Sequence, residues 1–185
     1  MPNRRNLPTV HAGSMADIAF LLLIFFLVTT TIAKDKGIAR KLPKKCPPGQ
    51  VCSLPIQERN VLRLFLNDTG ELLVNDEIIP VSQLKEKLIE FIDNNGDGSC
   101  HYCNGLGSIH YSENPKKAVI SLSTDRLAAY SEFIRVQDEI TKAYLDLREK
   151  YALDILEKTA AELSESELEE VKTAYPFLIS EAEIN

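Results

Sequence analysis

A single acidic residue, Asp17, stands at the start of the most apolar stretch of the chain. Residues 18–33 carry no charge and are mainly Leu, Ile, Phe and Val, a composition typical of a helix that faces lipid. A carboxylate inside a bilayer costs roughly 2.5–3.5 kcal/mol, so an ionisable residue at that depth indicates a functional site. Asp17 is therefore the first candidate functional residue of this sequence.

The length of the apolar run predicts that Asp17 lies inside the membrane. The run contains 16 residues, which as a helix span about 24 Å, whereas the hydrocarbon core is about 30 Å thick. Because Lys34, Asp35 and Lys36 are expensive to bury, we expect the helix to gain its extra turn upstream and to cover residues 12–33. The alternative is an interfacial helix that Asp17 caps by accepting backbone N–H groups, and the length argument disfavours it.

Small residues lie one helical turn before Asp17. Gly13 and Ser14 share its side of the helix and form a notch that can admit a closely packed partner helix. Toward the other end, Thr29 and Thr30 can bond a neighbouring helix or line a polar path, or they can bond their own backbone. The sequence leaves both interpretations of these threonines open.

Four cysteines form two close pairs after the apolar run, Cys46 with Cys52 and Cys100 with Cys103. In an oxidising compartment, structural disulfides are the favoured interpretation. The C-x-x-C spacing of the second pair also suits a zinc site, to which the first pair and His110 would add ligands. A thioredoxin-like catalyst is disfavoured because this C-x-x-C does not open a helix after a strand.

Two further motifs have ordinary explanations. Residues 93–98, Asp-Asn-Asn-Gly-Asp-Gly, match the first half of a calcium loop, but Asn104 stands where a bidentate Glu is needed, so a polar turn is favoured. His11 at the membrane edge can pass protons toward Asp17, although a solvated histidine is the simpler interpretation. We predict no resident metal, no cofactor and no catalytic residue.

Turn residues and hydrophobic periodicity divide the rest of the chain into elements that would carry these residues. A polar stub at 1–11 precedes the membrane helix, and a basic, proline-rich linker at 34–60 follows it. A domain over 61–155 is predicted to contain a hairpin (61–67 and 71–75), a helix that Ser82 caps (82–94), a strand parallel to an earlier one (118–123) and a long helix (125–155). The predicted fold class is α+β, a single N-terminal transmembrane helix followed by this small domain.

Two segments do not fit this simple order. Residues 95–117 are rich in glycine and long for a connection inside a compact domain, so we predict an insertion there. Residues 156–185 form an acidic tail that is predicted to be helical, because Ser164 and Glu167 have the spacing of a capping box for a last helix that Pro176 ends. No final strand is evident after the long helix.

Charge is unevenly distributed along the chain, whose formal net charge is −6. Six Lys and Arg residues crowd positions 34–45, and the last third is rich in Glu. Nothing in this distribution suggests a nucleic-acid partner. The basic cluster argues, by the positive-inside rule, for a cytoplasmic C-terminal side. A cleaved signal peptide, with Arg4 and Arg5 before the apolar run, is a rival interpretation of the N-terminus, but the run is long for one and opens with an acid.

Residues 13–32, GSMADIAFLLLIFFLVTTTI, resemble the membrane helix of the ExbD/TolR family and closely resemble the version found in Bacteroidota. Asp17 matches the family's single intramembrane Asp. Residues 61–124 resemble the family's small periplasmic domain, and TDRLAAYSEFIRVQDEITKAYLDLRE resembles the helix that follows it. The cysteine-containing insertion, the missing final strand and the acidic tail depart from the family pattern.

The resemblance implies an inner-membrane subunit, without enzymatic activity, of a proton-driven complex that powers transport at the outer membrane. Asp17 would take and release the protons. The implied partners are an ExbB- or TolQ-like multi-spanning protein, a TonB-like protein, a second copy of the chain and membrane lipid. The implied topology is single-pass, with a cytoplasmic N-terminus and a periplasmic domain, and it overrides the basic cluster. The alternatives are a membrane-tethered periplasmic binding or cell-wall-anchoring module, as in TolR-like envelope maintenance, and a periplasmic thiol oxidoreductase.

Overall fold

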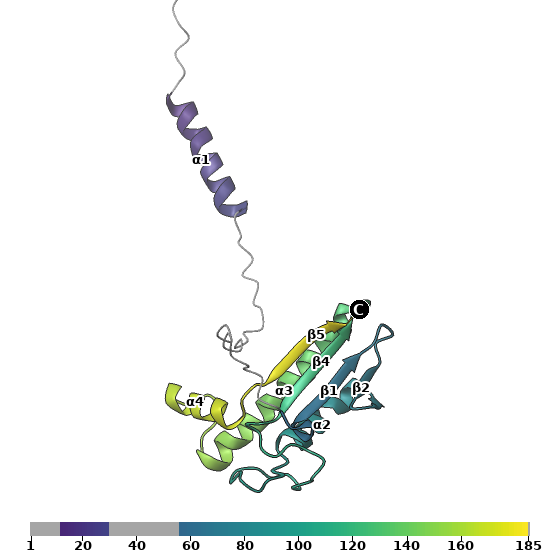
Figure 1. Cartoon of the computed structure of the whole chain (residues 1–185). Coiled ribbons are helices and arrows are strands. Elements are labelled where there is room, and N and C mark those ends of the chain that lie inside the picture. Colours follow the sequence, from purple (N-terminus) through teal and green to yellow (C-terminus); the bar gives the residue numbers. More distant parts are fainter. Residues whose placement is uncertain (1–11, 30–55, 185) are drawn as a thin grey trace, which may run out of the picture. The chain divides into compact units, whose positions relative to one another are not determined.

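The computed structural model describes residues 12–29 and 56–184. The chain separates into two compact units, Met1–Val51 and Cys52–Asn185. Figure 1 shows the single described helix of the first unit and the mixed sheet with its helices in the second.

The first unit contains the apolar helix α1 (Ala12–Thr29). Its 18 residues span about 27 Å at the usual helical rise. By length and composition α1 can cross a membrane, and none of its side chains is buried in the structure. The helix begins at the first residue of the predicted range, while residues 30–33 of that range lie outside the described part of the chain.

The second unit is built on a five-stranded mixed sheet. The strands are β1 (Val61–Leu66), β2 (Leu72–Val74), β3 (Glu77–Ile79), β4 (Val119–Asp125) and β5 (Ile179–Ile184), in the spatial order β3-β2-β1-β4-β5. The first three strands form an antiparallel meander. β4 pairs parallel to β1, and β5 pairs parallel to β4. Parallel pairs require long crossover connections, and these carry the helices.

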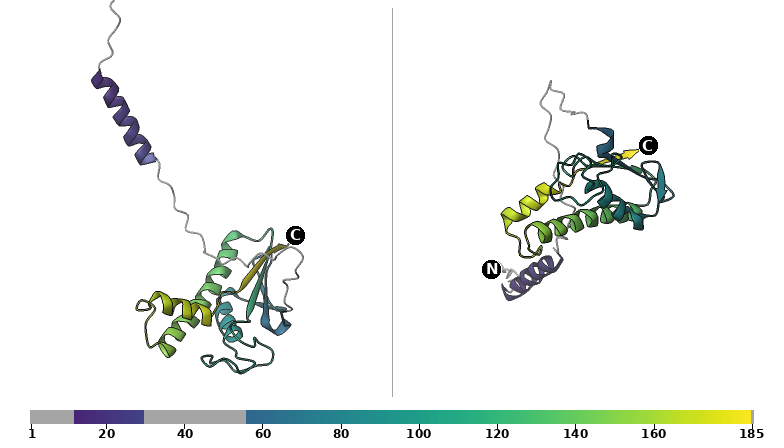
Figure 2. Two further views of the ribbon diagram at one scale, coloured as in Figure 1. Left: turned by 60° about the vertical axis from the view of Figure 1, so that its left-hand side comes forward. Right: turned by 90° about the horizontal axis from the view of Figure 1, so that it is seen from below.

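Three helices form the crossovers. α2 (Leu84–Ile92) lies between β3 and β4, whereas α3 (Tyr130–Ile155) and α4 (Glu165–Ala174) lie between β4 and β5. Figure 1 shows α2 and α3 behind the strands, on one face of the sheet, and Figure 2 shows α4 beside the C-terminal end of α3. Short 3₁₀ turns precede β1 (Glu58–Asn60) and α2 (Val81–Gln83).

The period-2 pattern of the strands decides which face packs on the helices. In β1, Leu62, Leu64 and Leu66 are buried and the intervening Arg63 is exposed. The same face continues into β4 and packs against α2 and α3. The resulting core includes Ile120 and Leu122 of β4, Leu88 and Phe91 of α2, and Ile140, Tyr144 and Leu147 of α3. Burying one large apolar side chain of this kind stabilises the fold by roughly 1.5–3 kcal/mol.

The α+β fold class is confirmed, and so are several of its elements. The hairpin is formed by β1 and β2, the strand predicted at 118–123 is β4, and β4 pairs parallel to β1 with Leu62 opposite Ile120. The long helix is α3. The capping box is present, since the Ser164 side chain accepts from the N–H of Glu167 and the Glu167 side chain accepts from the N–H of Ser164.

Two predicted features of the domain are wrong. The acidic tail contains the predicted last helix, α4, which ends before Pro176, but it is not helical beyond that point: Ile179–Ile184 forms β5 at the edge of the sheet, where no final strand was evident from the sequence. The segment ISEAEI carries little local strand signal, and its pairing with β4 is a long-range event. Ser82 does not cap α2; it lies within the preceding 3₁₀ turn, and the N-cap residue Gln83 makes no side-chain capping bond. The short strand β3 was also not predicted; it follows a turn in which Asn75 and Asp76 adopt positive φ.

Candidate functional site

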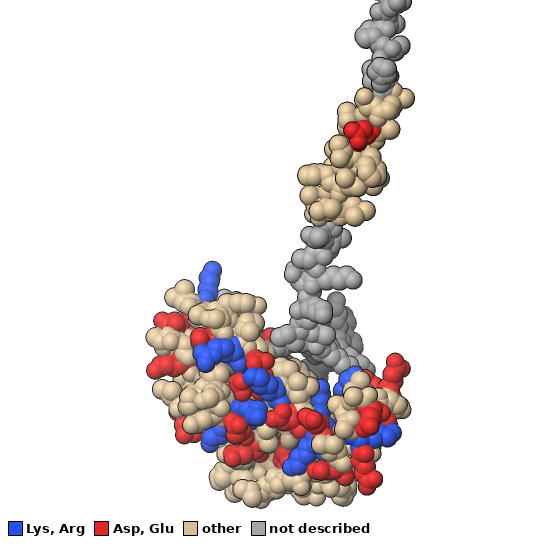
Figure 3. All heavy atoms as spheres, turned by 180° about the vertical axis from the view of Figure 1, so that it is seen from behind, with Lys and Arg blue, Asp and Glu red and all other residues tan. Residues whose placement is uncertain are grey.

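Asp17 lies in the second turn of α1 and is the only charged residue of that helix. Its side chain is exposed and accounts for the red patch on α1 in Figure 3, where the rest of the helix is tan. The large apolar side chains around it are exposed as well, among them Ile18, Phe20 and Leu21. No side chain of α1 is buried among the described residues.

The notch below Asp17 has no explanation within the described part of the chain. Gly13 precedes Asp17 by four residues, and a Cβ placed at Gly13 would meet nothing within 4 Å. Glycine inside a helix costs about 1 kcal/mol relative to alanine. Gly13 and Ser14 are both exposed in the structure, and their packing against another helix stays a prediction.

The other residues proposed around the membrane helix are only partly described. The Thr29 hydroxyl donates a hydrogen bond of 2.8 Å to the carbonyl oxygen of Phe25, one turn earlier on its own helix. This is the self-bonding arrangement. Thr30 and His11 lie outside the described residues.

A second cluster of polar groups lies in the insertion at residues 95–117. A disulfide joins Cys100 and Cys103, whose Cα atoms are 5.6 Å apart. Cys46 and Cys52 lie outside the described residues, so the structure contains no account of that pair. Within 12–29 and 56–184, no group of three or more His, Cys, Asp and Glu side chains is placed to hold a metal ion. His110 is exposed and does not join the cysteine pair in a ligand set.

The carboxyl group of Asp93 holds the insertion and the C-terminal segment together. Asp93 is buried at the C-terminal end of α2. Its Oδ1 accepts a hydrogen bond of 2.6 Å from the Tyr175 hydroxyl, and its Oδ2 accepts one of 3.1 Å from the backbone N–H of Asn104. Burial, and then the hydrogen bond to Asp93, raise the pKa of the Tyr175 hydroxyl, so this hydroxyl stays protonated and donating.

Asn94 organises the far side of the insertion. It is almost fully buried, and its Nδ2 donates 2.8 Å hydrogen bonds to the carbonyl oxygens of Ser108 and Ser112, while its Oδ1 accepts from the N–H of Ser108. The backbone of Gly105 lies so close to the end of α2 that a Cβ at Gly105 would be 2.3 Å from the Asp93 carbonyl oxygen. Glycine is therefore needed at 105 for the close approach of two backbones.

The insertion is also tied to the start of β1. The Arg59 guanidinium donates to the carbonyl oxygens of Tyr111 and Ser108, at 3.1 and 3.3 Å. The buried Asn60 exchanges hydrogen bonds with Glu113, accepting from its backbone N–H at 2.8 Å and donating to its carboxylate at 3.3 Å. The segment that leads into the sheet is thus held by the same insertion that contacts Tyr175 through Asp93 and Asn104.

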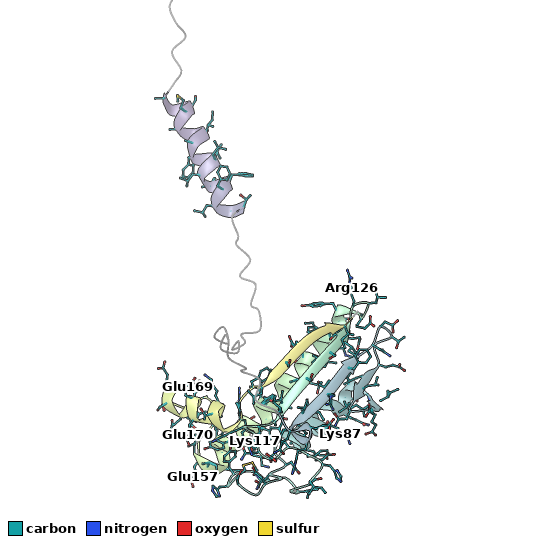
Figure 4. All side chains as sticks on the ribbon, viewed as in Figure 1. Lys87, Lys117, Arg126, Glu157, Glu169 and Glu170 are labelled. Carbon is teal, nitrogen blue, oxygen red and sulfur yellow. A yellow bond between two sulfur atoms is a disulfide. The ribbon has the colours of Figure 1, made fainter. Side chains whose placement is uncertain are left out.

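The calcium-like motif serves as a polar turn in this arrangement. The Asp97 carboxylate accepts from the hydroxyl and N–H of Ser99, at 2.6 and 3.0 Å, and from Lys117 at 3.2 Å. The bonds from Ser99, with a smaller contribution from Lys117, hold the pKa of Asp97 below its usual value. Lys117, labelled in Figure 4, also pairs with Glu113 at 2.8 Å.

The surface of the helices carries mixed charge. Figure 3 shows Lys and Arg interspersed with Asp and Glu over this side of the domain. Several of these charges form ion pairs, including Lys85 with Asp146 at 3.0 Å and Lys142 with Asp138 at 2.7 Å. This is a solvated surface, on which such exposed pairs contribute little each.

Sequence reasoning missed the residues that join the insertion to the domain, chiefly Arg59, Asn94, Tyr102, Gly105 and Tyr175. No spacing or motif identifies them, because their partners lie 11 to 82 residues away. The one available signal was the concentration of Asn, Gly and Tyr in a long loop, which is typical of a loop with its own internal hydrogen bonds.

The chain matches the family model described as biopolymer transport protein ExbD/TolR over residues 3–148. The matched range includes α1 with Asp17, strands β1 to β4, the insertion and most of α3, whereas α4 and β5 lie beyond it. No curated protein matches the chain.

Proposed function

Because the chain belongs to the ExbD/TolR family of biopolymer transport proteins, we propose that it is the proton-carrying subunit of an energy-transducing complex in the inner membrane. Proteins of this family are transport-associated membrane components and not enzymes. The observation that carries the proposal is Asp17, the single charge on an apolar helix of 18 residues.

The physical argument rests on the two forms of the Asp17 carboxyl group. The neutral acid passes through apolar surroundings far more cheaply than the anion. A proton that binds from one side of the membrane and leaves to the other makes available about 2.3 kcal/mol per charge for each 100 mV of membrane potential. We propose that this energy shifts α1 between two arrangements against its partners, since helices at subunit interfaces move by small steps between discrete packings.

The partners follow from the same helix. We place two copies of α1 within an ExbB- or TolQ-like multi-spanning protein, with Gly13 and Ser14 at the contact. We place residues 12–33 across the membrane with a cytoplasmic N-terminus, and the domain, which includes the anchored residues Arg59 and Asn60, in the periplasm. The two close cysteine pairs support an oxidising compartment. A TonB-like protein receives the motion and transmits it to transport at the outer membrane.

Asp17→Asn tests the proposal, because it keeps the shape of the side chain and removes its titration. We expect loss of energy-dependent uptake in cells at unchanged protein abundance, with partial uptake retained in Asp17→Glu. Asp68→Asn, an equivalent change at an exposed acid in the β1–β2 turn, is the matched control and leaves uptake unchanged. Full uptake in Asp17→Asn at normal abundance contradicts a proton-carrying role.

The phenotype of Asp17→Asn also distinguishes a TonB-type role from a TolR-type role. Loss of outer-membrane uptake with an intact envelope supports the TonB-type role. Leakage of periplasmic proteins from the variant cells, with uptake intact, supports a TolR-type role instead. Co-purification of the wild-type chain with a multi-spanning membrane protein is expected in both cases, and its absence contradicts the motor as a whole.

A further inference from the structure

Tyr102, which lies inside the ring closed by the Cys100–Cys103 disulfide, contacts the C-terminal end of α4. Its hydroxyl donates a hydrogen bond of 2.8 Å to the carbonyl oxygen of Ala174. Its ring meets those of Tyr151 and Tyr175 edge to face, with centroids 5.0 and 5.4 Å apart. Burial raises the pKa of Tyr102 to about 12, so the hydroxyl donates throughout the physiological range. A single side chain of the insertion thus joins α3, α4 and the residue that follows α4.

The segment that Tyr102 contacts leads directly into the edge strand. Ala174 is the last residue of α4, and β5 begins at Ile179. Within the described sheet β5 pairs only with β4. The intervening Tyr175 is held by Asp93 through its hydroxyl and by Arg148, which donates two hydrogen bonds to its carbonyl oxygen at 3.0 and 2.8 Å. Ala174 and Tyr175 therefore fix the point at which the chain enters β5, which is held in addition by its pairing with β4.

Of the side chains that hold Ala174 and Tyr175, Tyr102 lies in a loop, and the disulfide restrains that loop. Asn95 exchanges hydrogen bonds with the backbone of Cys100, at 3.0 and 2.9 Å, and the N–H of Asn104 is bound to Asp93. Between these two anchors, the backbone of His101 and Tyr102 is restrained by the disulfide and by a hydrogen bond of 3.3 Å from the Asn104 side chain to the Tyr102 carbonyl oxygen. Cys100 is buried and Cys103 is half-buried, so Cys103 is the more accessible of the two cysteines to an external thiolate.

We propose that the Cys100–Cys103 disulfide is a redox latch that, through Tyr102, holds the C-terminal segment 171–184 on the domain. A dithiol reductant attacks Cys103 Sγ and breaks the sulfur–sulfur bond; its second thiol then displaces Cys103, so that the reductant leaves as a disulfide and both cysteines become thiols. Two electrons and two protons pass from the reductant to the cysteine pair. Tyr102 then loses its restraint, and α4 and β5 open more often. The inference does not depend on the role of Asp17.

The expected size of the effect follows from the ring. On the chain-entropy model, a disulfide that closes a loop of about four residues reduces the number of conformations open to the unfolded segment by a factor of roughly 20. This factor is an upper bound for the change in the opening equilibrium on reduction. We therefore expect amide exchange in residues 171–184 to accelerate by several-fold and by no more than roughly 20-fold.

Hydrogen exchange on the full-length chain in detergent tests the latch. Cys46 and Cys52 are replaced by alanine so that dithiothreitol, the reductant used, acts only on the pair in the insertion. On reduction, exchange in 171–184 is expected to accelerate, while exchange in β2 and β3, on the opposite edge of the sheet, is unchanged. Unchanged exchange in 171–184 on full reduction overturns the proposal, as does an equal acceleration in all strands, which would indicate global loss of stability.

A thermodynamic cycle with Tyr102→Ala identifies the residue through which the latch acts. In the oxidised chain, Tyr102→Ala is expected to accelerate exchange in 171–184 to at least the level of the reduced wild type. Reduction of Tyr102→Ala is then expected to add little, because the contact that the disulfide restrains is already lost. Additive effects of the two changes contradict a latch that acts through Tyr102. Since the reduced form is made from the folded chain, the test does not require a cysteine variant of the insertion to fold.

Discussion

The Tyr175 hydroxyl donates a hydrogen bond of 2.6 Å to the buried carboxyl group of Asp93, a residue 82 positions earlier in the chain. This bond joins the end of α2 to the segment between α4 and β5. Tyr175→Phe removes the donor and leaves a buried carboxyl oxygen without it, so we expect the free energy of unfolding to fall by about 1.5–3 kcal/mol. Tyr151→Phe, which removes a hydroxyl bonded to the exposed Glu170, is the control and is expected to cost less than about 1 kcal/mol. Urea unfolding measures both, and equal losses would contradict the special role of the Asp93 contact.

Gly105→Ala tests the close approach of the insertion to the end of α2. The new Cβ would lie 2.3 Å from the Asp93 carbonyl oxygen and 2.4 Å from the Asn94 Cα. Both neighbours are backbone, so the loop must move, and we expect a loss of about 1–3 kcal/mol in unfolding free energy. Leu106→Ala changes a side chain that is 99% exposed in the adjacent position and is expected to stay within about 0.5 kcal/mol of wild type. A Gly105→Ala protein as stable as Leu106→Ala would contradict the observed approach.

The carboxyl group of Glu167 makes the stability of the fold around α4 dependent on pH. Hydrogen bonds from Lys158, and then from Ser164, lower the pKa of Glu167 to about 2. A carboxyl group whose pKa is lower in the folded than in the unfolded state stabilises the fold above the unfolded value, near 4.3, and loses that contribution as the pH falls toward 2. Glu167→Gln keeps the capping-box geometry without the titration, so the variant should be less stable than wild type at pH 7 and equal to it near pH 2.

Unfolding free energies between pH 2 and pH 7 check this expectation. Glu165→Gln, at an exposed acid in the same first turn, provides the control. A stability difference between Glu167→Gln and wild type that is the same at pH 2 as at pH 7 would rule out the lowered pKa as its source.

Gly13→Leu fills the notch below Asp17 and tests its use in helix packing. We expect the variant to be inserted normally but to lose association with its multi-spanning partner and with the second copy, because two backbones can no longer approach closely. Ala19→Leu adds similar bulk on the opposite side of α1 and should retain both associations. Co-purification from membranes and crosslinking at Ser14 measure the outcome, and retained association in Gly13→Leu would argue against a contact at this notch.

Local patterns accounted for the elements whose signals are contiguous in the sequence. The hairpin, β4, α3 and the capping box at Ser164 were all predicted, because a turn signal, a strand period or a helix cap is complete within a few residues. β5 was missed for the opposite reason. Its segment ISEAEI becomes a strand through pairing with β4, as in Ile120 opposite Ile179, and that partner lies about sixty residues away.

The sequence by itself determined the apolar helix with its one carboxyl group, since composition, length and the position of Asp17 require no knowledge of distant contacts. It also indicated the class of the domain and the close spacing of the cysteine pairs. Only the tertiary structure brought the insertion, Asp93 and Tyr175 together and placed Tyr102 on the end of α4. The physical reason is that hydrogen bonds between buried groups depend on which segments the folded core brings into contact. Residues such as Asn94 and Gly105 belong to no periodic pattern from which their partners could be predicted.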